Sequence, residues 1–298
     1  MANMKQTVRE PFGDRLFLGF IYLALTIVLV ITLYPLIFIV SSSFSSPSAV
    51  SGGRVWLWPV EATLIGYKSV FLSSQIITGF LNSLFYTVCG TAISVILTIL
   101  IAYPLSRKTF FGRSGLMMFI VFTMLFSGGL IPTYMVVKSV GLVNTRWALL
   151  LPNAIWVWQV IIARTFFATS IPDELAEASE IDGCSDTRFV ISIVLPLSKA
   201  IIAVLALQYA IGQWNAYFDA LIYLKSDKLF PLQLFLRSIL ILNSNTGTLD
   251  SGQIAEKQQL LSLMKYSLIV ISSLPVLLIY PFVQRYFVQG MLIGSVKG

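Results

Sequence analysis

The sequence has no histidine and only two cysteines, Cys89 and Cys184. The lack of imidazole excludes histidine-based acid–base catalysis, and two thiols provide neither a metal-ligand spacing nor a disulfide framework. We expect Cys89 in an apolar span and Cys184 in a loop. The sequence also lacks a G-x-x-x-x-G-K-[ST] phosphate loop, so the chain is not expected to hydrolyse ATP itself. The isolated pair Gly128–Gly129 is interpreted as a helix break rather than a nucleotide site.

Charged residues are scarce as well. They make up 11% of the 298 residues, whereas hydrophobic residues make up 57% and the mean hydropathy is +0.85. A soluble domain carries about 25% charged residues, so this chain falls in the membrane class. The net charge of +7 comes from 20 Lys and Arg residues. These lie at the ends of apolar runs, where they suit lipid headgroups and cytoplasmic loops better than nucleic acid.

Long stretches without charge locate the predicted membrane spans. Six intervals of 17 or more residues lack Asp, Glu, Lys and Arg, and a helix needs about 20 apolar residues to cross the hydrocarbon core. We therefore predict an all-α integral membrane protein in which residues 1–298 form a single domain with six transmembrane helices. The predicted spans cover residues 16–40, 80–105, 114–137, 147–168, 199–221 and 264–285. Lys and Arg in the short loops favour a multi-pass plasma membrane protein with both termini cytoplasmic.

The few acidic residues are unevenly distributed. Six of the 13 fall within 14 positions, and these are Asp173, Glu174, Glu177, Glu180, Asp182 and Asp186. The surrounding pattern predicts a cytoplasmic loop over residues 172–196. A first helix is expected to start at Pro172 and to stop at Gly183, because proline suits the first helical position and glycine suits a helix end.

A second short helix is predicted to follow in the same loop. Ser185 or Asp186 caps it, it covers Thr187 to Val194, and Pro196 ends it. Anionic lipids of the inner leaflet repel acidic residues, so a helix lying on that surface is expected to be basic. The acidic cluster therefore favours docking to another protein, and a merely solvated helical face is the alternative.

The loop between the last two predicted spans, residues 222–262, contains two different segments. Residues 231–242 (PLQLFLRSILIL) have the pattern of an interfacial or packed helix. Residues 243–252 (NSNTGTLDSG) are polar and rich in turn formers, which predicts a loop.

Two predicted spans carry polar residues among apolar ones. The candidates for a solute pathway are Gln208, Gln213, Trp214 and Asn215 in the fifth span and Gln159 in the fourth. Polar groups in hydrocarbon usually face the protein interior or an aqueous path, and rings beside amides suit a sugar. Hydrogen bonding between helices is an equally good account of Gln208 and Gln213. Trp156 and Trp158 fit an aromatic belt at the membrane interface.

The sequence EASEIDGCSDTRFVISIVLPL, which starts at Glu177, resembles the EAA loop of binding-protein-dependent ABC importer permeases. The residues that match the pattern are Glu177, Ala178, Asp182, Gly183, Phe189, Leu195 and Pro196, and Ser179 replaces the second alanine. Trp214–Asn215 and the last stretch, Tyr280 to Gly298, are similar to the carbohydrate subfamily and its shorter, MalG-like member.

This resemblance implies the type I ABC importer permease fold, with the loop at 172–196 as a coupling helix seated in an ATPase subunit. The coupling residues would be Glu177, Ala178, Ser179, Asp182, Gly183, Leu195 and Pro196. Glu177 would meet an arginine of that subunit, and Gly183 would allow the tight turn. ATP and Mg would be bound by the partner ATPase, and no cofactor is expected in this chain.

The same resemblance implies the other partners and the function. A second six-span permease would complete the pathway, an ATPase dimer would drive it, and an extracytoplasmic solute-binding protein would deliver an oligosaccharide. The 222–262 loop would then probe that binding protein, with a plain linker as the alternative. Likeness across the chain favours acidic oligosaccharides from polysaccharides, such as alginate fragments. A permease for another small solute class and an ATP-independent membrane channel are the alternatives.

Overall fold

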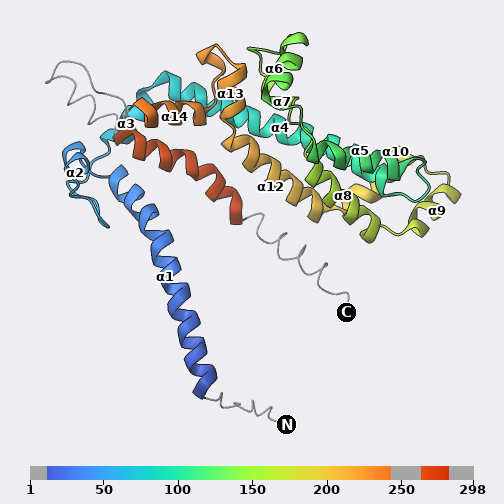
Figure 1. Cartoon of the computed structure of the whole chain (residues 1–298), viewed down its shortest axis with the longest axis horizontal. Coiled ribbons are helices and arrows are strands. Elements are labelled where there is room, and N and C mark those ends of the chain that lie inside the picture. Colours follow the sequence, from blue (N-terminus) through green and yellow to red (C-terminus); the bar gives the residue numbers. More distant parts are fainter. Residues whose placement is uncertain (1–11, 243–262, 282–298) are drawn as a thin grey trace. The chain divides into compact units, whose positions relative to one another are not determined.

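The computed structural model describes residues 12–242 and 263–281, and every regular element in these ranges is a helix (Figure 1). The helices of the first half are α1 (Phe12–Ser43), α2 (Pro47–Ser51), α3 (Ile65–Leu72), α4 (Ser74–Ser106), α5 (Arg113–Leu125), α6 (Leu130–Ser139) and α7 (Trp147–Leu150). Those of the second half are α8 (Val157–Ser170), α9 (Asp173–Ile181), α10 (Asp186–Phe189), α11 (Leu195–Leu197), α12 (Lys199–Asn215), α13 (Phe218–Tyr223) and α14 (Leu232–Leu242). A π-helical turn covers Val190–Val194, a 3₁₀ turn covers Asp227–Leu229, and a further helix covers Leu263–Pro281.

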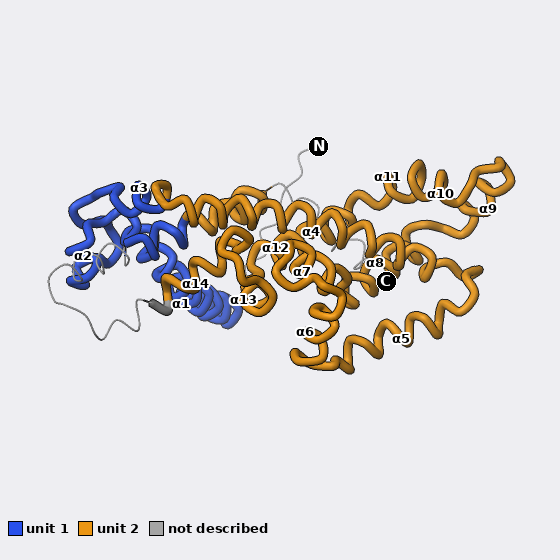
Figure 2. The backbone as a smooth tube through the Cα atoms, turned by 90° about the horizontal axis from the view of Figure 1, so that it is seen from above, with its two compact units in different colours: residues 1–70, 245–270 blue, residues 71–244, 271–298 orange. Residues whose placement is uncertain are grey.

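The chain divides into two compact units, residues 1–70 with 245–270 and residues 71–244 with 271–298 (Figure 2). In the first unit, α1 is apolar on all sides and no residue before Ser41 is buried. Such a helix suits a lipid environment better than a protein core. At its end, the Ser43 hydroxyl lies 2.8 Å from that of Tyr67, and the Ser45 hydroxyl donates to the Ser41 carbonyl at 2.7 Å, which replaces a lost intrahelical partner.

The second unit is built on α4, against which α8 and α12 pack (Figure 1). The buried residues at this contact are Val95, Ile99, Ala102 and Leu105 of α4, Val160, Ala163 and Phe167 of α8, and Ile201, Leu205 and Tyr209 of α12. Van der Waals packing of this kind is what holds helices together in lipid, where no hydrophobic force acts between them.

Two glycines let these helices approach closely. Gly90 of α4 faces Gln213, and a Cβ at Gly90 would lie 2.8 Å from the Cδ of that glutamine. Gly212 of α12 lies against the indole of Trp156, and a Cβ there would overlap the ring. Small residues at helix crossings are typical of membrane bundles.

One hydroxyl group joins all three helices. The Tyr209 hydroxyl of α12 accepts a hydrogen bond from the backbone N–H of Trp156 at 3.2 Å and lies 2.7 Å from the Thr98 hydroxyl of α4. Trp156 precedes the first residue of α8, whose first N–H groups have no intrahelical partner. The Trp156 ring also packs on the Tyr209 ring, with centroids 5.0 Å apart. Trp156 is therefore a packing residue here and not part of an interfacial belt, while Trp158 is 60% exposed.

Several helices are broken where the sequence predicts continuous spans. The span expected at 114–137 consists of α5 and α6, which are bent by 115°. The break contains Gly128 and Gly129, as predicted, and Gly129 has a φ of 80° that favours glycine. The span expected at 199–221 is also divided, because α12 ends at Asn215 and α13 begins at Phe218.

The span expected at 147–168 is not one helix either. Residues 151–156 separate α7 from α8, which has 14 residues. Pro152 lies in this gap, and a proline has no N–H for a helix and crowds the preceding turn. By length and composition, the described residues contain three helices able to cross a membrane: α1, α4 and Leu263–Pro281. Counting each of the two bent pairs as one span raises the number to five.

We expect Tyr209→Phe to destabilise the second unit. The change leaves the Trp156 N–H buried without its acceptor, which costs about 1–3 kcal/mol. The measurement is the denaturation midpoint of the purified protein in detergent. Tyr34→Phe is the matched control because Tyr34 is 44% exposed, and its midpoint should not move. Equal midpoints for Tyr209→Phe and wild type would contradict the structural role of this hydroxyl.

Candidate functional site

The acidic segment, residues 172–197, forms three short helices, α9, α10 and α11, and a π-helical turn between the last two. Its first helix, α9, starts at Asp173, with Pro172 as the preceding N-cap residue. Asp173 and Glu174 lie in its first turn, where carboxylates favour the helix dipole. Ser179 is buried on the inner side, and its hydroxyl donates to the Ala176 carbonyl at 2.7 Å.

The outer side of α9 combines acidic and apolar groups. Glu174, Glu177, Ala178 and Ile181 recur at positions i, i+3, i+4 and i+7, which places them on one helical face. All four are exposed, and Ile181 is 87% exposed. We call these four residues the α9 face.

Helix α9 ends in a tight turn built on Gly183. The N–H of Cys184 donates to the Ser179 carbonyl at 2.9 Å, and the N–H of Gly183 donates to the Glu180 carbonyl at 3.0 Å. This pair of bonds, with Gly183 at a φ of 71°, is the Schellman arrangement. Asp182 is the exposed last residue before the turn. The predicted stop at Gly183 is therefore confirmed, since the left-handed conformation suits a residue without a Cβ.

The second half of the acidic segment is anchored in the core of the second unit. Ser185 caps α10 by accepting from the N–H of Arg188. Phe189 and Val194 are buried among residues of α4, α8 and α12, and Leu195 is partly buried against them. The helix was expected to stop at Pro196. Instead, it runs to Leu197, with an exposed Pro196 inside it, because a proline in the first turn of α11 needs no N–H partner.

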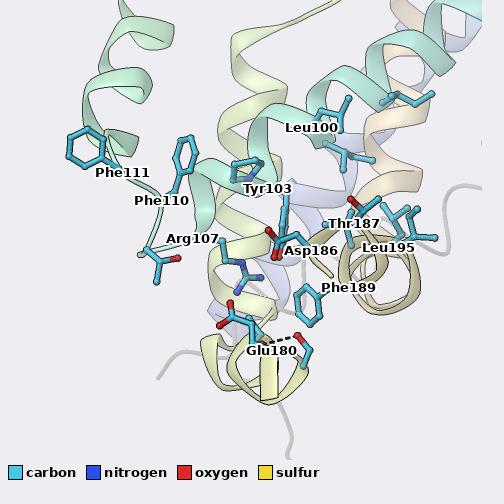
Figure 3. A pocket seen from close by; sticks show the side chains of 18 residues that line it. Leu100, Tyr103, Arg107, Phe110, Phe111, Glu180, Asp186, Thr187, Phe189 and Leu195 are labelled. Carbon is cyan, nitrogen blue, oxygen red and sulfur yellow. Dashed lines mark hydrogen bonds between the residues drawn. The ribbon is translucent and has the colours of Figure 1, made fainter. Parts of the chain in front are cut away.

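A hollow of about 790 Å³ lies between the end of α4 and the acidic segment (Figure 3). Leu100 and Tyr103 line it from α4, and Glu180 and Asp186 line it from the acidic segment. Most of the lining is apolar. Its charged groups are the carboxylates of Glu180 and Asp186 and the guanidinium of Arg107.

Basic residues just after α4 contact the start of α9. Lys108 Nζ lies 3.0 Å from Asp173 Oδ2, and Arg107 Nη1 lies 3.4 Å from Asp173 Oδ1. The hydrogen bond from Lys108, together with the positive charges of Lys108 and Arg107, lowers the pKa of the Asp173 carboxyl below its usual range. Asp173 therefore remains ionised and paired at neutral pH.

The residues proposed for a solute pathway differ in their exposure. Gln159, Gln213 and Trp214 are buried, and the Trp214 indole donates to the Ser272 carbonyl at 2.9 Å. Gln208 and Asn215 are exposed, and the Asn215 amide bonds the Ile211 carbonyl of its own helix. Packing therefore accounts for Gln213 and Trp214, whereas Gln208 and Asn215 remain candidates.

The sequence interpretation missed a polar anchor near the start of α4. Asn82 Nδ2 donates to the carbonyls of Lys228 and Phe230 at 2.8 and 3.1 Å. The Tyr86 hydroxyl donates to the Leu229 carbonyl, and the Ser83 hydroxyl accepts from the Leu232 N–H, both at 2.8 Å. The adjacent polar pair at 82–83 in an apolar run was the available signal.

This anchor fixes the chain that leads into α14. The helix α14 falls within the predicted packed segment 231–242, and Leu232 and Leu234 are buried. The polar segment 243–252 and the stretch from residue 282 to 298 lie outside the described residues.

An all-helical chain with apolar spans and an acidic helix–turn–helix between two of them defines a membrane transport permease. None of the models that describe known protein families matches this chain. It belongs, however, to the permease subunits of ABC sugar transport systems. The polygalacturonan/rhamnogalacturonan transport system permease protein YtcP of Bacillus subtilis (strain 168) is 42% identical over 289 residues, covering 96% of this chain and 99% of the relative.

Two further comparisons support this membership. Protein LplC of Bacillus subtilis (strain 168) is 44% identical over 269 residues, covering 90% of each chain. The crystal structure of a bacterial ABC transporter involved in the import of the acidic polysaccharide alginate contains a chain similar to this one. The TM-score is 0.86 at 32% identity, covering 94% of this chain and all of that one.

We expect Asn82→Leu to loosen the chain that leads into α14. The variant leaves the carbonyls of Lys228 and Phe230 without their donor, at a cost of about 1–3 kcal/mol for each buried group left unsatisfied. Limited proteolysis should cleave faster between residues 224 and 232. Asn215→Leu is the matched control, because it loses only a bond within α12. Similar cleavage rates for the two variants would contradict the anchor.

Proposed function

We propose that this chain is a membrane-spanning subunit of an ATP-driven oligosaccharide importer, and that its acidic segment is the site where an ATPase subunit drives it. The observation that carries this proposal is the α9 face, with two exposed carboxylates beside an 87% exposed isoleucine. Such a face disfavours an anionic lipid surface and suits a protein cleft with basic walls and an apolar floor.

Helix α9 is connected rigidly to the membrane helices, as is needed if an ATPase subunit is to move them through it. The Schellman turn at Gly183 joins α9 to α10 through backbone hydrogen bonds. Phe189 and Val194 then fix the next turns in the core of α4, α8 and α12. A displacement of α9 would therefore reach the membrane helices directly and would not be absorbed by a loose loop.

The remaining partners follow from this role. A second permease of the same type would complete the pathway, and an ATPase dimer would bind ATP and Mg. An extracytoplasmic solute-binding protein would deliver the solute, and the segment anchored by Asn82 is the part of this chain we assign to that contact. We retain six spans in the lipid bilayer with both termini cytoplasmic. Three are the long helices α1, α4 and Leu263–Pro281, and the others are the bent pair α5–α6, the segment with α7 and α8, and the segment with α12 and α13.

We assign the solute to acidic oligosaccharides derived from polysaccharides. Support comes from the names of two similar proteins, one a polygalacturonan/rhamnogalacturonan permease and the other part of an alginate importer. The exposed amides of Gln208 and Asn215 are the residues of this chain that we assign to the solute path. A binding scan of the cognate solute-binding protein against oligogalacturonates, alginate fragments and neutral oligosaccharides tests the assignment, and binding of neutral sugars alone would contradict it.

We expect Glu177→Lys to abolish coupling. The change puts a positive charge on the α9 face opposite basic residues of the ATPase, so transport and solute-stimulated ATP hydrolysis should fall at least about tenfold, equivalent to about 1.4 kcal/mol. The measurement uses the complete complex in proteoliposomes. Asp227→Lys reverses an exposed charge outside the acidic segment and should leave co-purification of the ATPase unchanged. Wild-type stimulated ATPase in Glu177→Lys would refute the coupling role.

We expect Gly183→Val to impair transport through backbone strain alone. No atom lies within 4 Å of a Cβ at this position, but its φ of 71° disfavours side chains that branch at Cβ. The strain is about 1–2 kcal/mol. Gly183→Asn is the matched variant, because asparagine tolerates this conformation, and it should retain more transport than the valine variant. Equal transport by the two variants would show that the turn geometry is unimportant.

A further inference from the structure

Arg107, the first residue after α4, is almost buried. Its side chain is 11% exposed, and its Nη1 donates to the Ile171 carbonyl and to Asp173 Oδ1, both at 3.4 Å. The guanidinium carbon lies 4.9 Å from the centre of the Tyr103 ring. A guanidinium does not lose its charge when it is buried, so the fold accepts a desolvation cost at this point.

The end of α4 is tied to α8 by a second arginine. Arg164 Nε donates to the Leu105 carbonyl at 3.2 Å. The last carbonyls of a helix have no intrahelical partner, so this bond satisfies one of them. Within three residues, Leu105 to Arg107, α4 is thus linked to α8 on one side and to the start of the acidic segment on the other.

Apolar packing makes only part of this second link. Ala176 of α9 is partly buried against the core, and Phe189 and Val194 provide the fully buried contact at the other end of the acidic segment. The 790 Å³ hollow lies beside Ala176, Ser179 and Glu180 of α9. Arg107 adds polar bonds at the N-terminal end of α9, and its side chain also lines the hollow (Figure 3).

Arg107 also has N–H groups that donate no hydrogen bond among the described residues. These groups, on Nε and Nη2, are buried. The carboxylates of Glu180 and Asp186 line the same hollow. These carboxylates are acceptors that the guanidinium could reach if α9 shifted.

We propose that Arg107 is the positioning residue that ties α4 to the coupling helix, so that movement of α9 is carried to the membrane bundle at this end as well as at Phe189. The inference rests on the proposed function, because it assigns the transmission route of the same site. Lys108 makes a shorter contact with Asp173, but its side chain is 77% exposed. Exposed pairs contribute little, so Lys108 is not the tie.

The test compares Arg107→Gln with Lys108→Gln in the complete importer, reconstituted with its ATPase and binding protein. The readout is the number of solute molecules transported per ATP hydrolysed. Coupling between sites typically corresponds to about 5–150-fold, and we expect this ratio to fall about tenfold in Arg107→Gln and to stay unchanged in Lys108→Gln. Arg107→Lys, which retains the charge, should recover part of the loss.

A purely structural role would lower yield and thermal stability without changing the ratio for the molecules that assemble. An unchanged ratio in Arg107→Gln, or an equal fall in Lys108→Gln, would overturn the proposal. Should Arg107→Gln not assemble, Asp173→Asn removes the carboxylate that Arg107 and Lys108 share. A fall of the ratio in Asp173→Asn with no fall in Lys108→Gln then supports the role of Arg107, and equal ratios in the two variants overturn it. Loss of transport in Glu177→Lys with a normal ratio in Arg107→Gln would refute only this inference, whereas normal coupling in Glu177→Lys would refute the proposed function itself.

Discussion

The hydroxyl group of Tyr209 is the point on which the second unit depends. A backbone N–H without a partner costs several kcal/mol in an apolar environment, and α8 begins at Val157 after a break in the chain. The Tyr209 hydroxyl accepts from the N–H of Trp156 and shares a hydrogen bond with Thr98. The start of α8 is thereby set by α12, which is in turn bonded to α4. A shift of α12 would break both hydrogen bonds, and a shift of α4 or of α8 would break one.

The position of the acidic segment depends on where α8 starts. Fourteen residues of α8 lead from Val157 to Ser170, and Phe167 and Ile171 are buried at the far end. The next residues begin α9, so its start is placed by α8 and then tied to α4 by Arg107. Two links between α8 and its neighbours use groups that a helix end leaves unsatisfied. Tyr209 accepts from the Trp156 N–H at the start of α8, and Arg164 of α8 donates to the Leu105 carbonyl near the end of α4. The helix ends thus leave backbone groups unpaired, and these groups form the hydrogen bonds between helices.

The sequence predicts those features that depend on local chemistry. Low charge and long apolar intervals predict helices, and α4 at Ser74–Ser106 includes the predicted span 80–105. Gly183 predicts the end of α9, because the left-handed turn requires a residue without a Cβ. The role of Trp156 was not predictable, because it depends on a tyrosine 53 positions further along the chain. The polar pair at 82–83 was visible in the sequence, but the partners of Asn82 were not, since they are backbone carbonyls of a distant loop and carbonyls carry no sequence signal.

Different interactions hold the two halves of the acidic segment, α9 and the turns that contain Phe189 and Val194. This difference suits a segment that a partner subunit moves. Apolar contacts in a packed core are rigid over short distances, and they hold the second half through Phe189 and Val194. The first half faces a hollow and is held by hydrogen bonds and ion pairs at its start. Polar bonds to a charged group with unused donors can be exchanged, whereas core contacts cannot be remade without opening a cavity. In the proposed importer, α9 would therefore turn about a fixed point at Phe189, and the end of α4 would follow the start of α9 through Arg107.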